Sequence, residues 1–125
     1  MFQHGDYHIG NMLLTASRSI ATIDVNRMGI GDPWEEFNRI VFCSHASPYF
    51  ASGRIHGYFD HQVPADFFKL LALYIACNTL SSIAWSKTIN AHEIKTMMKQ
   101  GNRVLEDYQW MKNIIPKWYI PAYNK

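Results

Sequence analysis

Chemically useful side chains are concentrated near the start of the chain. His4, Asp6, His8 and Asn11 lie within residues 4–11, and Asp24 follows a short apolar run. A carboxylate can accept a proton from a hydroxyl group, and carboxylate and amide oxygens are ligands that Mg²⁺ prefers. Phosphoryl transfer needs few other protein groups, because positioning and electrostatics supply most of the catalysis. These residues are therefore candidates for a catalytic site.

A β-hairpin is expected to bring two of these residues together. Apolar runs at residues 12–15 and 20–23 are separated by the polar segment 16–19, a pattern typical of two strands joined by a turn. Asn11 and Asp24 then stand at the open end of the hairpin. Their side-chain oxygens can approach one site there.

A helix is expected directly after the hairpin region. Asp32 can cap it, Pro33 suits its first position, and Glu35 and Glu36 face the positive end of its dipole. We expect this helix to run to about Cys43.

The remainder of the chain reads as a loop followed by two longer helices. Prolines and glycines within residues 44–63 predict a long loop with one helical turn at most. The segment from Pro64 is apolar around most of its helical circumference, which predicts a helix in the centre of a bundle. Asn90 with Glu93 resembles a capping box and opens a helix with one apolar face. The tail, residues 114–125, is expected to be irregular, so the predicted fold is mainly α (α+β): a helical bundle with a short hairpin.

Composition and charge indicate which kinds of partner and which cellular location to expect. The 12 basic and 10 acidic residues among 125 are scattered, so neither a nucleic acid nor a membrane surface is indicated as a partner. Lys69 and Asn78 interrupt the longest apolar run, which favours a buried helix over a membrane span. No secretion signal is recognisable. Cys43 and Cys77 lack CxxC spacing, so we expect a cytoplasmic protein with reduced, buried thiols, with a disulfide as the less favoured alternative.

The opening segment has the spacing of a kinase catalytic loop. The pattern H-R-D-x-x-x-x-N is met from His4 to Asn11, with Gly5 in place of the arginine. The string HGDYHIGNMLL, with Ile-Asp ending at Asp24 and Gly-Asp-Pro-Trp at residues 31–34, resembles the aminoglycoside phosphotransferase and choline kinase superfamily. These enzymes are small-molecule relatives of the protein kinases. The resemblance implies a kinase-like C-terminal lobe, and it is strong only over roughly residues 1–40.

The resemblance also implies the chemical roles of three residues. Asp6 would be the catalytic residue, which orients the substrate hydroxyl or accepts its proton. Asn11 and Asp24 would be the metal ligands, holding Mg²⁺ against the phosphates of ATP or GTP.

Four further residues are implied as support for the loop. His4 would hold the loop by hydrogen bonds, with His8 beside it, and Gly5 would allow a backbone conformation that a β-carbon hinders. Asp32 would cap the next helix and stabilise the site. Residues 25–27 depart from the family pattern after the metal-binding aspartate.

Simpler interpretations stay open for the same residues. Asp6 and Asn11 are also residues that bond their own backbone in turns. His4 and His8 have the spacing of a zinc-binding pair, but Gly5 stands where H-E-x-x-H has glutamate, so zinc is disfavoured.

Other polar and aromatic residues have ordinary structural explanations. Four histidines are expected on the surface or in loops: His45, His56, His61 and His92. Two methionines and four tryptophans are expected in the core: Met97, Met98, Trp34, Trp85, Trp110 and Trp118. Solvated acids are favoured over a groove for a cationic substrate at four positions: Glu35, Glu36, Asp60 and Asp66.

The nucleotide-binding half of a kinase is not represented in the sequence. No GxGxxG motif occurs, and no lysine precedes the catalytic loop. We therefore expect residues 1–125 to be one domain, the C-terminal lobe of an ATP-dependent phosphotransferase that acts on a small-molecule hydroxyl, weak or inactive as this fragment. The alternatives are a non-catalytic remnant, which pairs with a second copy through the surface of the missing lobe, and an unrelated helical binding module.

Overall fold

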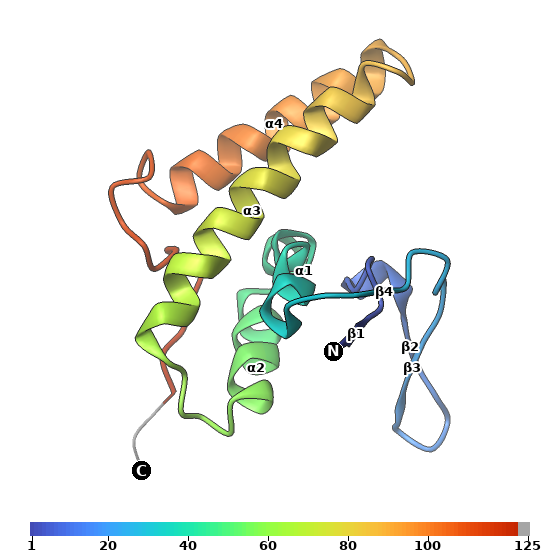
Figure 1. Ribbon diagram of the computed structural model, residues 1–125, viewed down its shortest axis with the longest axis vertical. Helices are drawn as coiled ribbons and strands as arrows, with labels where there is room; N and C mark the ends of the chain where they lie inside the picture. Colours follow the sequence, from blue (N-terminus) through green and yellow to red (C-terminus); the bar gives the residue numbers. More distant parts are fainter. Residues whose placement is uncertain (123–125) are drawn as a thin grey trace.

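The computed structural model describes residues 1–122, which form two small antiparallel sheets followed by helices (Figure 1). Strand β1 (Phe2–Gln3) pairs with β4 (Gly29–Ile30), and β2 (Met12–Leu14) pairs with β3 (Ile20–Thr22). The two sheets lie on one side of the molecule, away from the long helices.

The β2–β3 hairpin confirms the sequence prediction. Its turn is closed by the Thr15 N–H, which donates to the Ser19 carbonyl at 2.9 Å. At the open end, the Ile23 N–H donates to the Asn11 carbonyl at 3.0 Å, and Asp24 follows directly. A short 3₁₀ turn, η1 (Ile9–Asn11), leads into β2. The hairpin therefore places the backbones of the two expected metal ligands beside each other.

Five helical segments follow and confirm the mainly α fold. They are the 3₁₀ helix η2 (Pro33–Phe37), α1 (Ile40–Ala46), α2 (Pro48–Tyr58), α3 (Ala65–Ser86) and α4 (Ala91–Asp107). Helices α3 and α4 form a long antiparallel pair, and α1 and α2 lie between that pair and the sheets (Figure 1).

Two sequence expectations about these helices were wrong. The single helix expected over residues 33–43 is divided into η2 and α1, with a break around Asn38 and Arg39. The loop expected over residues 44–63 contains α2, because Ser47 accepts the N–H of Phe50 as an N-cap and proline occupies the first helical position. The expected start of the last helix was right, since the Asn90 side chain accepts the Glu93 N–H at 2.9 Å.

The hydrophobic core lies where η2, α1, α2, the first half of α3 and the end of α4 meet. Its buried members are Phe37, Ile40, Val41, Cys43, Ala51, Ile55, Phe67, Phe68, Leu71, Ile75, Val104, Tyr108 and Trp118. Aromatic rings dominate its centre, where Phe37 and Phe67 meet edge to face at 5.2 Å. This core holds η2 and α1 against α3 and so supports the N-terminal segments packed on them.

Helix α3 is not surrounded by other elements, contrary to the expectation for a central helix. Its main partners are α4 and η2, so one side of it is covered, while Leu73 and Leu80 on the other side are exposed. Of the helices within residues 1–122, α3 alone is long and apolar enough to cross a membrane, with a mean hydropathy of 1.5. Only 22% of that apolar window is buried, and its buried members include Phe67, Leu71 and Ile75.

Several individual burial predictions were also wrong. Trp85 and Trp110 are half or more exposed, Met98 is exposed, and only Trp118 of the four tryptophans is buried. Cys43 is buried and Cys77 exposed, and both thiols are free, which excludes the disulfide alternative.

Two of the four histidines expected at the surface are buried or partly buried. His56 in α2 is buried and lies 2.8 Å from the Ile120 carbonyl through Nε2. His45 in α1 lies 3.7 Å from Asp107 at the end of α4. Both link early helices to the C-terminal part of the chain.

Candidate active site

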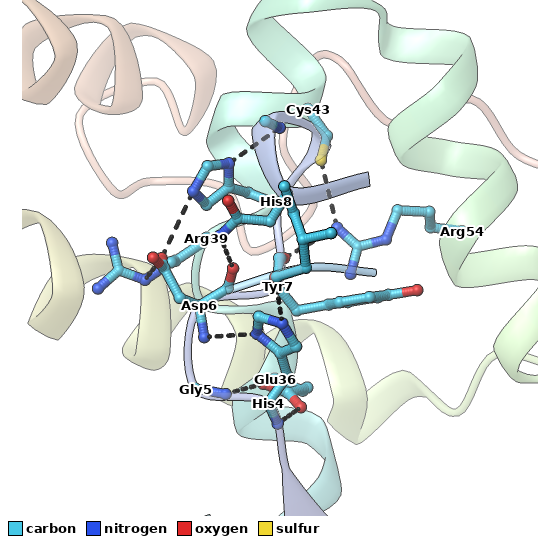
Figure 2. Close-up of polar contacts among 12 residues, drawn as sticks. His4, Gly5, Asp6, Tyr7, His8, Glu36, Arg39, Cys43 and Arg54 are labelled. Atoms are coloured by element: carbon cyan, nitrogen blue, oxygen red, sulfur yellow. Dashed lines mark hydrogen bonds and ion pairs between the residues drawn. The ribbon is translucent and has the colours of Figure 1, made fainter. Parts of the chain in front are cut away.

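The Asp6 carboxylate is held by two neighbouring side chains (Figure 2). Nε of Arg39 lies 2.9 Å from its Oδ1, and Nε2 of His8 lies 3.5 Å from the same oxygen. The arginine contact is an ion pair without hydrogen-bond geometry, since neither atom has a hydrogen-bond partner in the described chain. Both side-chain contacts therefore fall on Oδ1. Within residues 1–122, Oδ2 has none.

His8 presents a protonated Nε2 to this carboxylate. Its Nδ1 accepts the N–H of Gly10 at 3.1 Å, so the proton of the neutral ring is on Nε2. Burial lowers the pKa of His8, Asp6 opposes that change, and Arg39 reinforces it. The ring packs 5.2 Å from that of Phe42 in α1. His8 is thus a neutral ring that lies beside Oδ1 of Asp6, at a contact distance of 3.5 Å without hydrogen-bond geometry.

Asn11 is bound to the same loop. It is buried, and its Nδ2 donates to the Asp6 carbonyl at 2.9 Å, which leaves the amide oxygen available. Asp24 has a left-handed backbone, with φ of 60°, and is exposed. Its Oδ1 accepts from Asn26 at 3.1 Å. The hairpin pairing next to both residues brings their backbones together.

The oxygen ligands of this pair suit a hard cation. Asn11 offers an amide oxygen that has no hydrogen-bond partner among residues 1–122, and Asp24 offers a solvent-exposed carboxylate. In the part of the chain described, no cluster of three or more His, Cys, Asp or Glu side chains could hold a metal ion. The two side-chain oxygens are of the type that Mg²⁺ prefers, so these residues fit such an ion if its other ligands come from outside the described chain.

His4 and Gly5 shape the entrance to the loop. His4 Nδ1 accepts the Asp6 N–H at 3.2 Å, and its Nε2 therefore donates to the Ile23 carbonyl at 2.9 Å. Gly5 has φ of 81°, and a β-carbon there would lie 2.1 Å from the Arg27 carbonyl oxygen. A side chain at position 5 would push the loop away from the segment that follows Asp24.

Glu36 anchors the loop from η2, contrary to its expected role as a solvated acid. Its carboxylate accepts the backbone N–H groups of both His4 and Gly5, the latter at 2.9 Å (Figure 2). No local motif signals this contact, because acidic residues at the start of a helix usually face solvent.

Arg54 in α2 anchors the loop from the other side, and the sequence analysis did not single it out. Its guanidinium donates to the Tyr7 carbonyl at 3.4 Å and lies 4.5 Å from the centre of the Tyr7 ring. It also contacts the Cys43 sulfur at 3.2 Å. Arg39 was missed in the same way, since neither arginine belongs to a local motif.

Asp32 lies at the junction of η2 and α3 rather than beside the Asp6 carboxylate. Its carboxylate caps η2 by accepting the Trp34 N–H at 3.0 Å, and it accepts a hydrogen bond from the Tyr74 hydroxyl of α3. That bond is the main cause that raises the pKa of Tyr74 to about 12. The residue connects the elements that support the loop.

A cavity of about 360 Å³ opens beside Asp6. The loop, α1, α3 and α4 all contribute to its walls. The lining residues include Asp6, His8, Arg39, Asn78, Trp85 and Glu93. The volume lies at the small end of the usual range for ligand pockets, about 300–1,000 Å³. The arrangement can therefore present the carboxylate of Asp6 to a small molecule.

Comparison with known proteins gives one match. The family model described as the phosphotransferase enzyme family matches residues 1–68, which is more than half of the chain. No curated protein and no solved structure matches. The matched region contains the Asp6 loop, the hairpin and the elements that supply Glu36, Arg39 and Arg54. It ends just after the start of α3.

Proposed function

This chain belongs to the phosphotransferase enzyme family, and on that premise we propose that it is the C-terminal lobe of an ATP-dependent phosphotransferase acting on a hydroxyl group of a small molecule. The observation that carries the proposal is the Asp6 carboxylate, which lines the cavity with one oxygen held and the other free. A nucleophile can be oriented by that free oxygen.

Asp6 is the catalytic residue of the proposed reaction. The substrate hydroxyl lies in the cavity and donates to Asp6 Oδ2 while Arg39 and His8 hold Oδ1. The hydroxyl oxygen forms a bond to the γ-phosphorus of ATP as its proton passes to Asp6. The bond between that phosphorus and the β,γ-bridging oxygen breaks, and its electron pair leaves with ADP. Because the transition state is loose, orientation of the hydroxyl matters more than strong basicity.

Asn11 and Asp24 are the residues that would hold Mg²⁺. When bound, the ion neutralises charge on the phosphates. The protein side of that site is a buried amide, oriented by its bond to the Asp6 carbonyl, and an exposed carboxylate. The same bond links the proposed metal ligand to the proposed catalytic residue through one loop.

The nucleotide requires further protein groups. Kinases clamp phosphates with a glycine-rich loop and a lysine, and neither motif occurs in these 125 residues. Positioning supplies most of the catalysis in this reaction, so we expect slow transfer by this chain alone. A nucleotide-binding lobe that covers Asn11 and Asp24 would raise the rate of phosphoryl transfer.

The test is direct observation of transfer by ³¹P NMR. The chain at high concentration is incubated with Mg²⁺, ATP and a mixture of polyols, and ADP and a new phosphate monoester are followed over days. We expect slow monoester formation by the wild-type chain and loss of at least about 10²-fold in Asp6→Asn.

Asp60→Asn is the matched control, since Asp60 lies in the turn after α2 and does not line the cavity. It should retain the wild-type rate. Equal rates in wild type and Asp6→Asn would refute the role of Asp6. Absence of any monoester from the wild-type chain would refute catalysis by it and favour the non-catalytic remnant.

A further inference from the structure

One face of α3 changes character along its length. Phe67 and Leu71 on this face belong to the core, and the same helical face continues at Asn78, Ser82 and Trp85, all of which line the cavity. Polar residues replace apolar ones where the helix passes Asp6. The polar stretch therefore forms one wall of this open cavity.

The polar groups of this wall have no partners within residues 1–122. Ser86, on the same helix, donates its hydroxyl to the Ile83 carbonyl at 2.6 Å. No hydrogen bond from the described residues occupies the side chains of three cavity residues: Asn78, Ser81 and Ser82. Together they offer two hydroxyls and one amide to a ligand, each able to donate and accept.

The wall also contains aromatic surface. Trp85 lines the cavity and is 50% exposed, and the Phe42 ring contributes from α1. Aromatic faces pack well against the C–H faces of a saturated ring, while hydroxyls at the ring edge need donors and acceptors such as those of Asn78 and the serines.

The charges that line the cavity are balanced. Asp6 and Glu93 are acidic, and Arg27 and Arg39 are basic. His8 is the remaining titratable group, and burial favours its neutral form. A polycation such as an aminoglycoside needs an excess of acidic groups, and a phosphorylated sugar needs an excess of basic ones. Neither excess is found on these walls.

We propose that the acceptor is an uncharged polyhydroxylated ring, a simple sugar or a cyclitol, with its face on Trp85 and its hydroxyls on Asn78, Ser81 and Ser82. This inference rests on the proposed function, because it identifies the cavity beside Asp6 as the acceptor site. A cavity of about 360 Å³ suits one such ring better than several linked rings.

Amide NMR of the labelled chain tests the class of ligand without requiring catalysis. The probes are methyl α-D-glucopyranoside and myo-inositol, with choline and kanamycin as cationic comparisons. We expect saturable shifts at residues 78–85 with the neutral probes and weaker ones with the cationic probes. Ser81→Ala/Ser82→Ala should raise the dissociation constant at least about fivefold, and Trp85→Ala should do the same.

Two control variants distinguish the loss of ligand contacts in the cavity from a general disturbance of the structure. Thr79→Val removes a hydroxyl from α3 where it lines a different, apolar pocket, and Trp110→Ala removes an exposed tryptophan outside the cavity. Both should bind the neutral probes as wild type does.

The outcomes distinguish this inference from the proposed function. Shifts at residues 78–85 with choline or kanamycin alone would overturn the neutral-ring class while leaving phosphoryl transfer intact. Absence of shifts there with every probe would also overturn it. Binding of the neutral probes without any monoester in the ³¹P experiment would support the ring site and refute catalysis.

Discussion

The guanidinium Nε of Arg39 lies 2.9 Å from Oδ1 of Asp6, and each side chain retains 18% of its exposure. Arg39 stands at the residue before α1, so the pair ties the loop to the helix that packs in the core. Burial lowers the pKa of Arg39, and the carboxylate of Asp6 acts in the opposite direction. The arginine thus both positions the carboxylate proposed as catalytic and compensates its charge.

Loss of the Asp6–Arg39 ion pair should lower the free energy of unfolding more than loss of an exposed ion pair. A double-mutant cycle of Asp6→Asn and Arg39→Gln should give a coupling energy of about 1–2 kcal/mol, between the values for exposed and buried pairs. The control is Asp66 with Lys69, which are 3.1 Å apart but 77% and 64% exposed. Their coupling should stay below about 0.5 kcal/mol. Urea unfolding of the single and double variants measures both coupling energies. Equal coupling energies for the two pairs would contradict the role of Arg39 in positioning Asp6.

Gly5→Ala should destabilise the protein by at least about 2 kcal/mol. The left-handed backbone disfavours alanine, and the new methyl group would meet the Arg27 carbonyl oxygen. Gly53→Ala is the control, because a β-carbon in α2 there meets nothing within 4 Å, and it should stabilise the protein by up to about 1 kcal/mol. Thermal unfolding compares them. Tolerance of Gly5→Ala would show that the loop does not approach residue 27.

Glu36→Gln should loosen the loop. The Glu36 carboxylate accepts two backbone N–H groups, one on each oxygen, whereas a glutamine amide has one accepting oxygen. We therefore expect the free energy of unfolding to fall by about 1.5–3 kcal/mol. Hydrogen exchange at the amides of His4 and Gly5 should accelerate. Glu35→Gln is the control, because within residues 1–122 the Glu35 carboxylate accepts one hydrogen bond, from the Gln3 side chain. If both variants behaved alike, Glu36 would be an ordinary surface acid.

His8 should make stability depend on pH. Its folded pKa is lowered, so below its usual pKa the unfolded chain takes up the proton more readily than the folded one. The contribution of neutral His8 to the free energy of unfolding is therefore fully present above about pH 6.5. It is lost as the pH falls toward the lowered pKa of His8 in the folded protein. His8→Asn keeps an acceptor for the Gly10 N–H and does not titrate. The loss in unfolding free energy between pH 7.5 and 5.5 should be smaller in the variant; an unchanged loss would assign the dependence to other groups.

Local features were the ones that the sequence could predict. The hairpin follows from two short apolar runs separated by a polar turn, and the start of α4 follows from the Asn90 side chain, which caps the Glu93 N–H. Helix α2 was missed because glycines at positions 53 and 57 suggested a loop. The Ser47 cap and the core contacts of α2 outweigh their low helix propensity.

The arrangement of the candidate site was predictable only where its residues are close in sequence. Asp6, Asn11 and Asp24 are joined by one loop and one hairpin, so a local pattern contains them. Glu36 and Arg54 reach the loop from 31 and 47 positions away, through hydrogen bonds to Gly5 and Tyr7. Such contacts are set by tertiary packing and leave no periodic or motif signal.

The most direct test of the central claim is paramagnetic NMR with Mn²⁺ in place of Mg²⁺ and a non-hydrolysable ATP analogue. Mn²⁺ can replace Mg²⁺ because both ions are hard cations that prefer oxygen ligands. We predict that the amides of Asn11 and Asp24 and their neighbours broaden first, and that Asp24→Asn removes the effect while Asp66→Asn, at an exposed position in α3, does not. Broadening centred away from this open end of the hairpin, or unaffected by Asp24→Asn, would contradict the account.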